Sequence, residues 1–180
     1  MGRKAKGLRI QNPDAFELFL FATAYLKGAA AMARGINLPW PYCMPVFVVE
    51  AFSVELHLKC LLRSERKLFK KGTHDIESLY KGLSPPSRRL IRESAGMSPA
   101  KLRSFFDRTN GIFQKLRYMH EGHQFPKVKK DRWGNFGTHE FVWAIRELLK
   151  YRHPDWEERM DKALPDIPMP ISQNPHLTDS

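Results

Sequence analysis

Apolar residues recur along this chain at the three- and four-residue spacing that forms one face of an α-helix. Four long stretches carry the pattern, and they predict helices over about residues 14–34, 45–69, 99–120 and 138–153. No run of alternating apolar and polar residues is long enough to predict a strand. The pattern therefore predicts an all-α fold, an up-and-down bundle of four main helices with short connecting helices.

Residues that start or stop helices flank these stretches. Asn12 or Asp14 can cap the first helix, and Gly35 stops it. Thr138 is predicted to cap the last long helix, and Pro154 to stop it.

Three shorter segments connect the main helices or follow them. Thr73 or His74 is predicted to cap a short helix over 75–82, and Ser84, followed by two prolines, starts another. A third short helix is expected over 155–164. The chain is therefore divided into a basic N-terminal segment (1–13), a helical domain (14–164) and a proline-rich tail (165–180) that is expected to be disordered.

The first helix is apolar on nearly all sides, which predicts a central place in the bundle. Basic residues precede its apolar run, as in a secretion signal. However, Asp14 and Glu17 lie just before the run and Lys27 ends it, and a membrane span needs about 20 apolar residues. We interpret the segment as the first core helix and expect no membrane association.

The two cysteines, Cys43 and Cys60, form neither a disulfide framework nor a metal-binding spacing. Cys60 lies within an apolar helical run, where a buried thiol is expected. The simplest interpretation is a reduced, cytoplasmic protein.

The charge of the chain favours an anionic partner. Its 180 residues include 30 Lys and Arg against 19 Asp and Glu, a formal net charge of +11. Such an excess is typical of proteins that bind nucleic acid or phosphorylated ligands, although solubility is an alternative explanation. The sequence has no zinc motif and no glycine-rich phosphate loop, so no cofactor is predicted.

The strongest indication of chemistry is a cluster of Arg117, His120, Glu121 and His123 at the end of the third long helix. Arginine binds phosphate with a fixed fork of donors, and histidine exchanges protons near neutral pH. The alternative is a charged helix end, in which the basic residues interact with the last carbonyl groups. Glu121 would then pair with Arg117 for less than about 0.5 kcal/mol.

Two further groups of residues could support such a site. Glu55 and Lys59 stand four residues apart, in the order that favours a helical ion pair. In the functional interpretation Glu55 orients Arg117 or a site histidine, whereas the alternative is an ion pair that is solvated or satisfied inside the bundle.

A basic loop follows the cluster. It could hold a nucleic-acid strand through phosphate contacts and stacking, or it could be a solvated loop. Its residues are Lys127, Lys129, Lys130, Arg132 and Trp133.

Three motifs give the chain a family resemblance. Residues 51–62 read AFSVELHLKCLL, residues 72–79 read GTHDIESL, and residues 117–121 read RYMHE. Their content and order resemble the HEPN superfamily, in which an E-L-x-L-K-x-L-L helix precedes a G-H-D-[IL] turn and an R-Y-x-[YH]-E element. The resemblance covers roughly residues 14–152.

The resemblance implies a helical bundle, commonly a homodimer. Many HEPN proteins are metal-independent endoribonucleases of toxin–antitoxin, abortive-infection or CRISPR-associated systems. Their arginine is followed four to six residues later by a histidine, and Arg117 and His123 leave five residues between them. By this resemblance Arg117 and His123 are catalytic, His120 assists, and the partners are RNA and an antitoxin protein. Relatives with an R-Y-x-[YH]-E element often look non-catalytic, so the alternative is a module that binds nucleic acid, a nucleotide or a protein.

Overall fold

The computed structural model describes residues 13–34, 44–69, 72–117 and 137–164, and describes residues 34, 44 and 111–117 by their backbone only. All the regular structure in these residues is helical, so the predicted all-α fold is confirmed. The helices are α1 (Ala15–Arg34), α2 (Met44–Ser64), α3 (Ile76–Gly82), α4 (Pro85–Ser94), α5 (Pro99–Arg117), α6 (Thr138–Arg152) and α7 (Trp156–Ala163).

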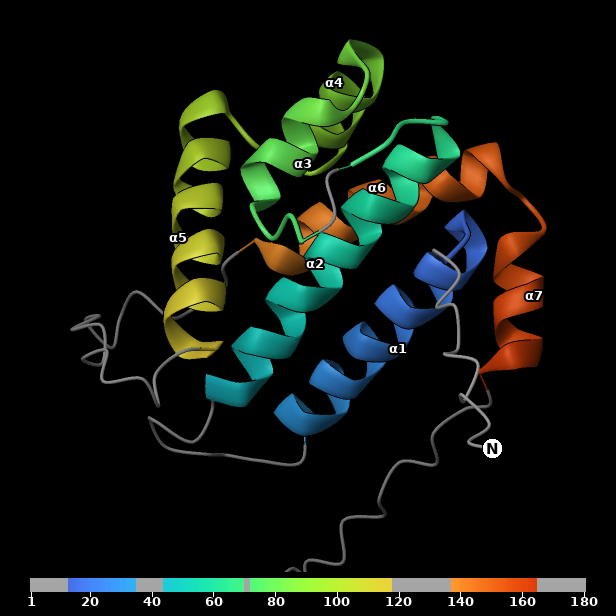
Figure 1. The fold of residues 1–180 in the computed structure, drawn as a ribbon, viewed down its shortest axis with the longest axis horizontal. Helices are drawn as coiled ribbons and strands as arrows, with labels where there is room; N and C mark the ends of the chain where they lie inside the picture. Colours follow the sequence, from blue (N-terminus) through green and yellow to red (C-terminus); the bar gives the residue numbers. More distant parts are fainter. Residues whose placement is uncertain (1–12, 35–43, 70–71, 118–136, 165–180) are drawn as a thin grey trace, which may run out of the picture.

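Helix α2 is the central element of the fold. It packs against α1, α3, α5 and α6, while α4 lies on α6 and α7 lies beside α1 (Figure 1). Helices α1 and α5 both run antiparallel to α2. The buried face of α2 includes Leu58, Leu61 and Cys60, whose thiol is buried as predicted.

Helix α1 is less central than its composition predicts. Leu18, Phe19 and Ala22 are buried, but Phe21 and Tyr25 are exposed. The expectation is corrected because α1 covers one side of α2, so only part of its apolar circumference meets the rest of the fold. By length and composition Ala15–Ala33 could cross a membrane, a property shared by core helices and signal sequences.

Local sequence accounts for the start of α1. The Asp14 carboxylate accepts a hydrogen bond from the Glu17 amide at 2.7 Å, and the Glu17 carboxylate accepts one from the Asp14 amide at 2.8 Å. This reciprocal capping box satisfies two amide groups that would otherwise lack partners. The prediction that Asp14 caps this helix is therefore confirmed.

Helix α2 ends five residues earlier than predicted, at Ser64 rather than at residue 69. Arg66 adopts a left-handed conformation with φ of 56°, and the Lys67 amide donates to the Leu62 carbonyl at 2.9 Å. This is a helix-ending turn that glycine usually makes. An arginine at that position gives no stop signal in the sequence.

Two predicted helix caps are corrected. Asp75, rather than Thr73 or His74, caps α3 by accepting a hydrogen bond from the Ser78 amide. Gly137 precedes α6 with φ of 71°, and Thr138 is the first residue of that helix. A side chain at position 137 would also meet Met97, since a Cβ there would lie 2.8 Å from its methyl carbon.

A network of hydrogen bonds and ion pairs around the Glu65 carboxylate joins α2 to α4 and α6. One Glu65 oxygen accepts hydrogen bonds from the hydroxyl groups of Ser84 and Ser87 and lies 3.2 Å from the Arg152 guanidinium. The other oxygen accepts from the Ser84 amide at 2.8 Å and lies 3.2 Å from the Lys67 ammonium. The N-terminus of α4 is thereby fixed beside the C-termini of α2 and α6.

Acid is expected to weaken this Glu65 network. Burial raises the pKa of the Glu65 carboxyl, but hydrogen bonds from Ser87 and Ser84 outweigh burial and lower that pKa from 4.5 to about 2. The stability that the carboxylate provides is thus complete above pH 4.5 and is lost as the pH falls towards 2, by about 2 kcal/mol. Urea denaturation at pH 5 and pH 2.5 measures this loss. The Glu65→Gln variant should lack this component, and an equal loss in both proteins would contradict the assignment.

Candidate functional site

The buried carboxylate of Glu55, on α2, faces the start of α3 and contacts two basic side chains. One of its oxygens is 2.5 Å from the Lys59 ammonium. The Nδ1 atom of His74 lies 3.2 Å from both oxygens. The Glu55 side chain is 1% exposed and that of Lys59 is 12% exposed, whereas that of His74 is 37% exposed. The cluster thus has a buried acid and a histidine at the surface.

The contact with Glu55 restricts the His74 ring. A carboxylate that accepts from Nδ1–H of a histidine favours the tautomer in which that nitrogen carries the proton. The carboxylate also limits the orientation of the ring. Glu55 therefore positions His74, and the sequence did not indicate that this histidine is the partner of Glu55.

Helix α5 is joined to the start of α3 by Asn110. Its amide group donates to the Asp75 carboxylate at 2.9 Å, and its side-chain oxygen accepts from the Ile76 amide at 2.9 Å. Burial raises the pKa of the Asp75 carboxyl, but hydrogen bonds from Ser78 and Asn110 outweigh burial and lower it. These bonds fix α5 relative to the residue that follows His74.

Position 117 follows from the register of α5. Arg117 is the last residue of that helix, seven residues after Asn110. Seven residues are nearly two turns, so position 117 lies on the same face as Asn110 and about 10 Å further along the axis.

The residues predicted to form the site divide into two sets. The Glu55–Lys59 contact is present, and the histidine that Glu55 contacts is His74. The Arg117 side chain and the whole of His120, Glu121 and His123 lie outside the described residues. The basic loop, with Lys127, Lys129, Lys130, Arg132 and Trp133, also lies outside them.

A second histidine, His57, lies on another face of α2 and belongs to the core. Its Nδ1–H donates to the Ser53 carbonyl at 2.8 Å, and the ring packs edge-on against Phe19 of α1. The Ser53 hydroxyl donates to the Ala22 carbonyl at 2.8 Å. These contacts join α2 to α1, so we assign His57 a structural role.

Among the described residues no group of three or more His, Cys, Asp or Glu side chains is arranged to hold a metal ion. Comparison of the chain with protein-family models, with curated proteins and with solved structures finds no match. The resemblance to the HEPN superfamily therefore rests on the three sequence motifs.

Proposed function

We propose that this protein is a HEPN-like up-and-down bundle of four main helices that cleaves RNA without a metal ion. The observation that supports this most directly is the contact of the surface histidine His74 with the buried carboxylate of Glu55. It lies beside the helix that ends in Arg117, and the sequence continues from there to His123. The net charge of +11 agrees with a polyanionic substrate.

The proposed reaction needs a base, an acid and a cation. The base removes the proton of a ribose 2′-hydroxyl, and the 2′-oxygen attacks the adjacent phosphorus. The bond from phosphorus to the 5′-oxygen breaks, and the acid protonates that oxygen. The products are a 2′,3′-cyclic phosphate and a 5′-hydroxyl end. Arg117 stabilises the charge that grows on the phosphate oxygens.

His123 is the proposed base or acid, and a second histidine completes the pair. His120, His74 or a second copy of His123 in a homodimer could serve, since a symmetric dimer doubles each group at its interface. In this proposal the protein is a cytoplasmic homodimer, and an antitoxin protein controls it.

A non-catalytic module that binds nucleic acid, a nucleotide or a protein partner is the second candidate function. The contact of Glu55 with Lys59 at 2.5 Å favours it. The charge of the buried carboxylate is already matched inside the fold, so its contact with His74 would serve to hold α3 against α2. Binding without turnover would then be the expected behaviour.

An RNA-cleavage assay under chelation separates the two functions. We expect the purified wild-type protein to cut single-stranded RNA in EDTA and leave 2′,3′-cyclic phosphate ends. Loss of proton transfer in His123→Ala should slow cleavage by about 10²- to 10⁴-fold. Loss of charge stabilisation in Arg117→Ala should slow it by about 10²- to 10³-fold. His139→Ala, which removes an exposed histidine from α6, is the matched control and should cleave at the wild-type rate.

Two results would decide against the cleavage proposal. Cleavage that persists in an Arg117→Ala/His123→Ala double variant purified in the same way would come from another site or a contaminant. RNA binding by a wild-type protein that produces no cyclic phosphate would favour the second function.

A further inference from the structure

Helices α3, α4 and α5 surround an open pocket of about 460 Å³. Five basic side chains line it, Lys81 from α3, three arginines from α4 and Arg103 from α5. Glu77 is the one acidic residue of the lining, and it is paired with Lys81 at 2.8 Å. The pocket therefore carries a strong positive charge on rigid helices.

The arginines of the pocket differ in how well they are neutralised. Arg89 and Arg92 lie 3.9 Å and 3.8 Å from the exposed carboxylate of Glu93. Arg88 and Arg103 have no ion pair within the described part of the chain. The Nε atom of Arg88 is buried and has no hydrogen-bond partner there. A buried donor of this kind is stabilised by an acceptor on a ligand.

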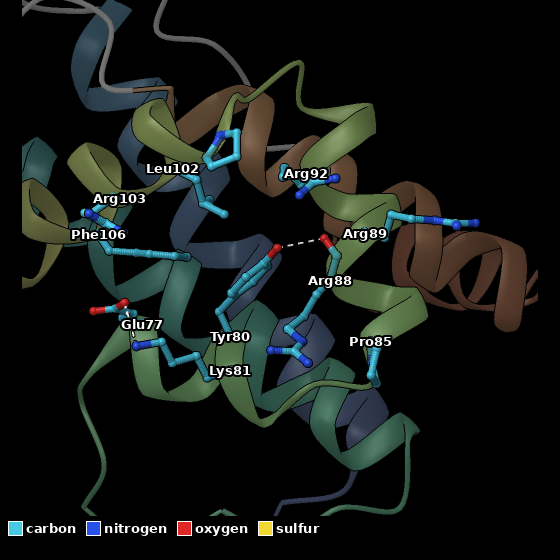
Figure 2. Close-up of a pocket in the computed structure, with 11 residues that line it drawn as sticks. Glu77, Tyr80, Lys81, Pro85, Arg88, Arg89, Arg92, Leu102, Arg103 and Phe106 are labelled. Atoms are coloured by element: carbon cyan, nitrogen blue, oxygen red, sulfur yellow. Dashed lines mark hydrogen bonds and ion pairs between the residues drawn. The ribbon is translucent and has the colours of Figure 1, made fainter.

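The floor of the pocket is apolar and held in place. Tyr80 and Phe106 pack with ring centroids 5.1 Å apart, and the Tyr80 hydroxyl donates to the Arg88 carbonyl at 2.7 Å. Figure 2 shows the guanidinium of Arg88 beside the Tyr80 ring and Arg92 at the upper rim, while Arg89 extends away from the floor. Tyr80 is 7% exposed and Phe106 is 4% exposed, so the cations stand around a narrow strip of aromatic surface.

We propose that this pocket binds a phosphorylated ligand of about nucleotide size. Arginine matches the geometry of phosphate oxygens and can donate two hydrogen bonds at once, and several cations suit a ligand with several negative charges. The volume falls within the range of about 300 to 1,000 Å³ that is typical of small-molecule sites. The phosphates are held by Arg88, Arg92 and Arg103, and the base or sugar covers the Tyr80–Phe106 floor.

Two sources share this chemistry, a free nucleotide and the 5′-phosphorylated end of an RNA strand. The pocket is distinct from the proposed cleavage site, because Arg103 and Arg117 are about 20 Å apart along α5. The proposal therefore does not depend on catalysis, and Arg117→Ala and His123→Ala should retain phosphate binding.

Isothermal titration of the full-length protein in 150 mM NaCl tests the proposal. The probes are ATP, inorganic pyrophosphate, and one short RNA prepared with either a 5′-phosphate or a 5′-hydroxyl end, and the RNAs are titrated into His123→Ala so that cleavage does not add heat. We expect one site per chain, with ATP binding more tightly than pyrophosphate because the floor adds contacts. Tighter binding of the 5′-phosphorylated RNA than of the 5′-hydroxyl RNA would identify the strand end as the source, and equal binding of the two RNAs with saturable ATP binding would identify the free nucleotide.

Matched variants separate the pocket from general charge. Arg88→Gln/Arg92→Gln should weaken binding by roughly tenfold or more, as expected for the loss of charge-assisted hydrogen bonds. Lys150→Gln/Lys162→Gln removes the same charge from exposed positions on α6 and α7 and should change affinity less than about twofold, because salt screens charges beyond about 8 Å.

The pocket variant should fold, since Tyr80 bonds to the backbone carbonyl of residue 88. Arg103→Gln, on an exposed position of α5, provides a second variant with the same expected direction. The proposal is overturned if every probe has a dissociation constant above about 1 mM. It is also overturned if pyrophosphate binds as tightly as ATP, or if the pocket and control variants lose affinity equally.

Discussion

Replacing Glu55 with alanine is expected to lower the free energy of unfolding by about 3 to 5 kcal/mol, the usual effect of removing one partner from a buried ion pair. The variant would leave Lys59, whose side chain is 12% exposed, without the carboxylate that lies 2.5 Å from its ammonium. It would also remove the acceptor for Nδ1 of His74 and so loosen the start of α3. Urea denaturation at pH 7, followed by circular dichroism, measures the change.

Two control variants define the origin of this effect. Glu158→Ala breaks an exposed ion pair with Lys162 at the same spacing on α7 and should cost less than about 1 kcal/mol. Glu55→Gln/Lys59→Met removes both charges and should retain near wild-type stability, because no buried charge is left unpaired. If Glu55→Ala costs no more than Glu158→Ala, the pair does not stabilise the fold.

The double variant also bears on the two candidate functions, because it keeps the fold while withdrawing the carboxylate from His74. If Glu55 positions a catalytic histidine, the rate at saturating RNA should fall and the pH dependence of that rate should shift, with unchanged RNA affinity. If the cluster only joins α3 to α2, both quantities should match the wild-type protein. The comparison thus tests positioning separately from stability.

Several helix ends that depend on neighbouring residues could be predicted, although the local cap Asp75 is predicted one or two residues too early. An end that depends on tertiary contacts could not be predicted. Asp14 and Glu17 form a local capping box, and Ser84 caps α4 in front of two prolines, as the sequence predicts. The end of α2 requires a left-handed Arg66, a conformation that costs an L-residue about 1 to 2 kcal/mol. Lys67 holds that turn by donating to the Gly82 carbonyl at 2.9 Å, a contact that depends on where α3 ends.

The contacts of the candidate sites also divide into local ones, which the sequence shows, and tertiary ones, which it does not. The Glu55–Lys59 contact joins adjacent turns of one helix, so its spacing is visible in the sequence. The contact of Glu55 with His74 spans 19 residues and depends on how α3 docks, and His74 also stands next to the true cap, Asp75. The arginines of the phosphate pocket could be read as an exposed helix face, because nothing in their spacing shows that α3 and α5 stand beside them.

Mild acid is expected to destabilise the protein through His57. The side chain is fully buried, and burial lowers its pKa from 6.5 to about 3, against the opposing effect of the hydrogen bond to the Ser53 carbonyl. The positive charge of Arg146 lowers the pKa further. Below pH 6.5 the unfolded chain binds a proton that the folded chain rejects until about pH 3, so stability is complete above pH 6.5 and falls as the pH decreases through this window.

Between pH 7 and pH 4.5 the loss should reach about 2 to 3 kcal/mol, since each pH unit below the unfolded pKa contributes about 1.4 kcal/mol. Urea denaturation at several pH values above 4.5 measures this loss before the Glu65 carboxyl of the unfolded chain begins to be protonated and adds its own effect. His57→Leu should flatten the slope, His139→Ala should not, and equal slopes in His57→Leu and the wild-type protein would contradict the prediction. Unfolding driven by His57 would lower the RNA-cleavage rate at acidic pH just as protonation of His123 would. The pH dependence of that rate must therefore be compared between the wild-type protein and His57→Leu.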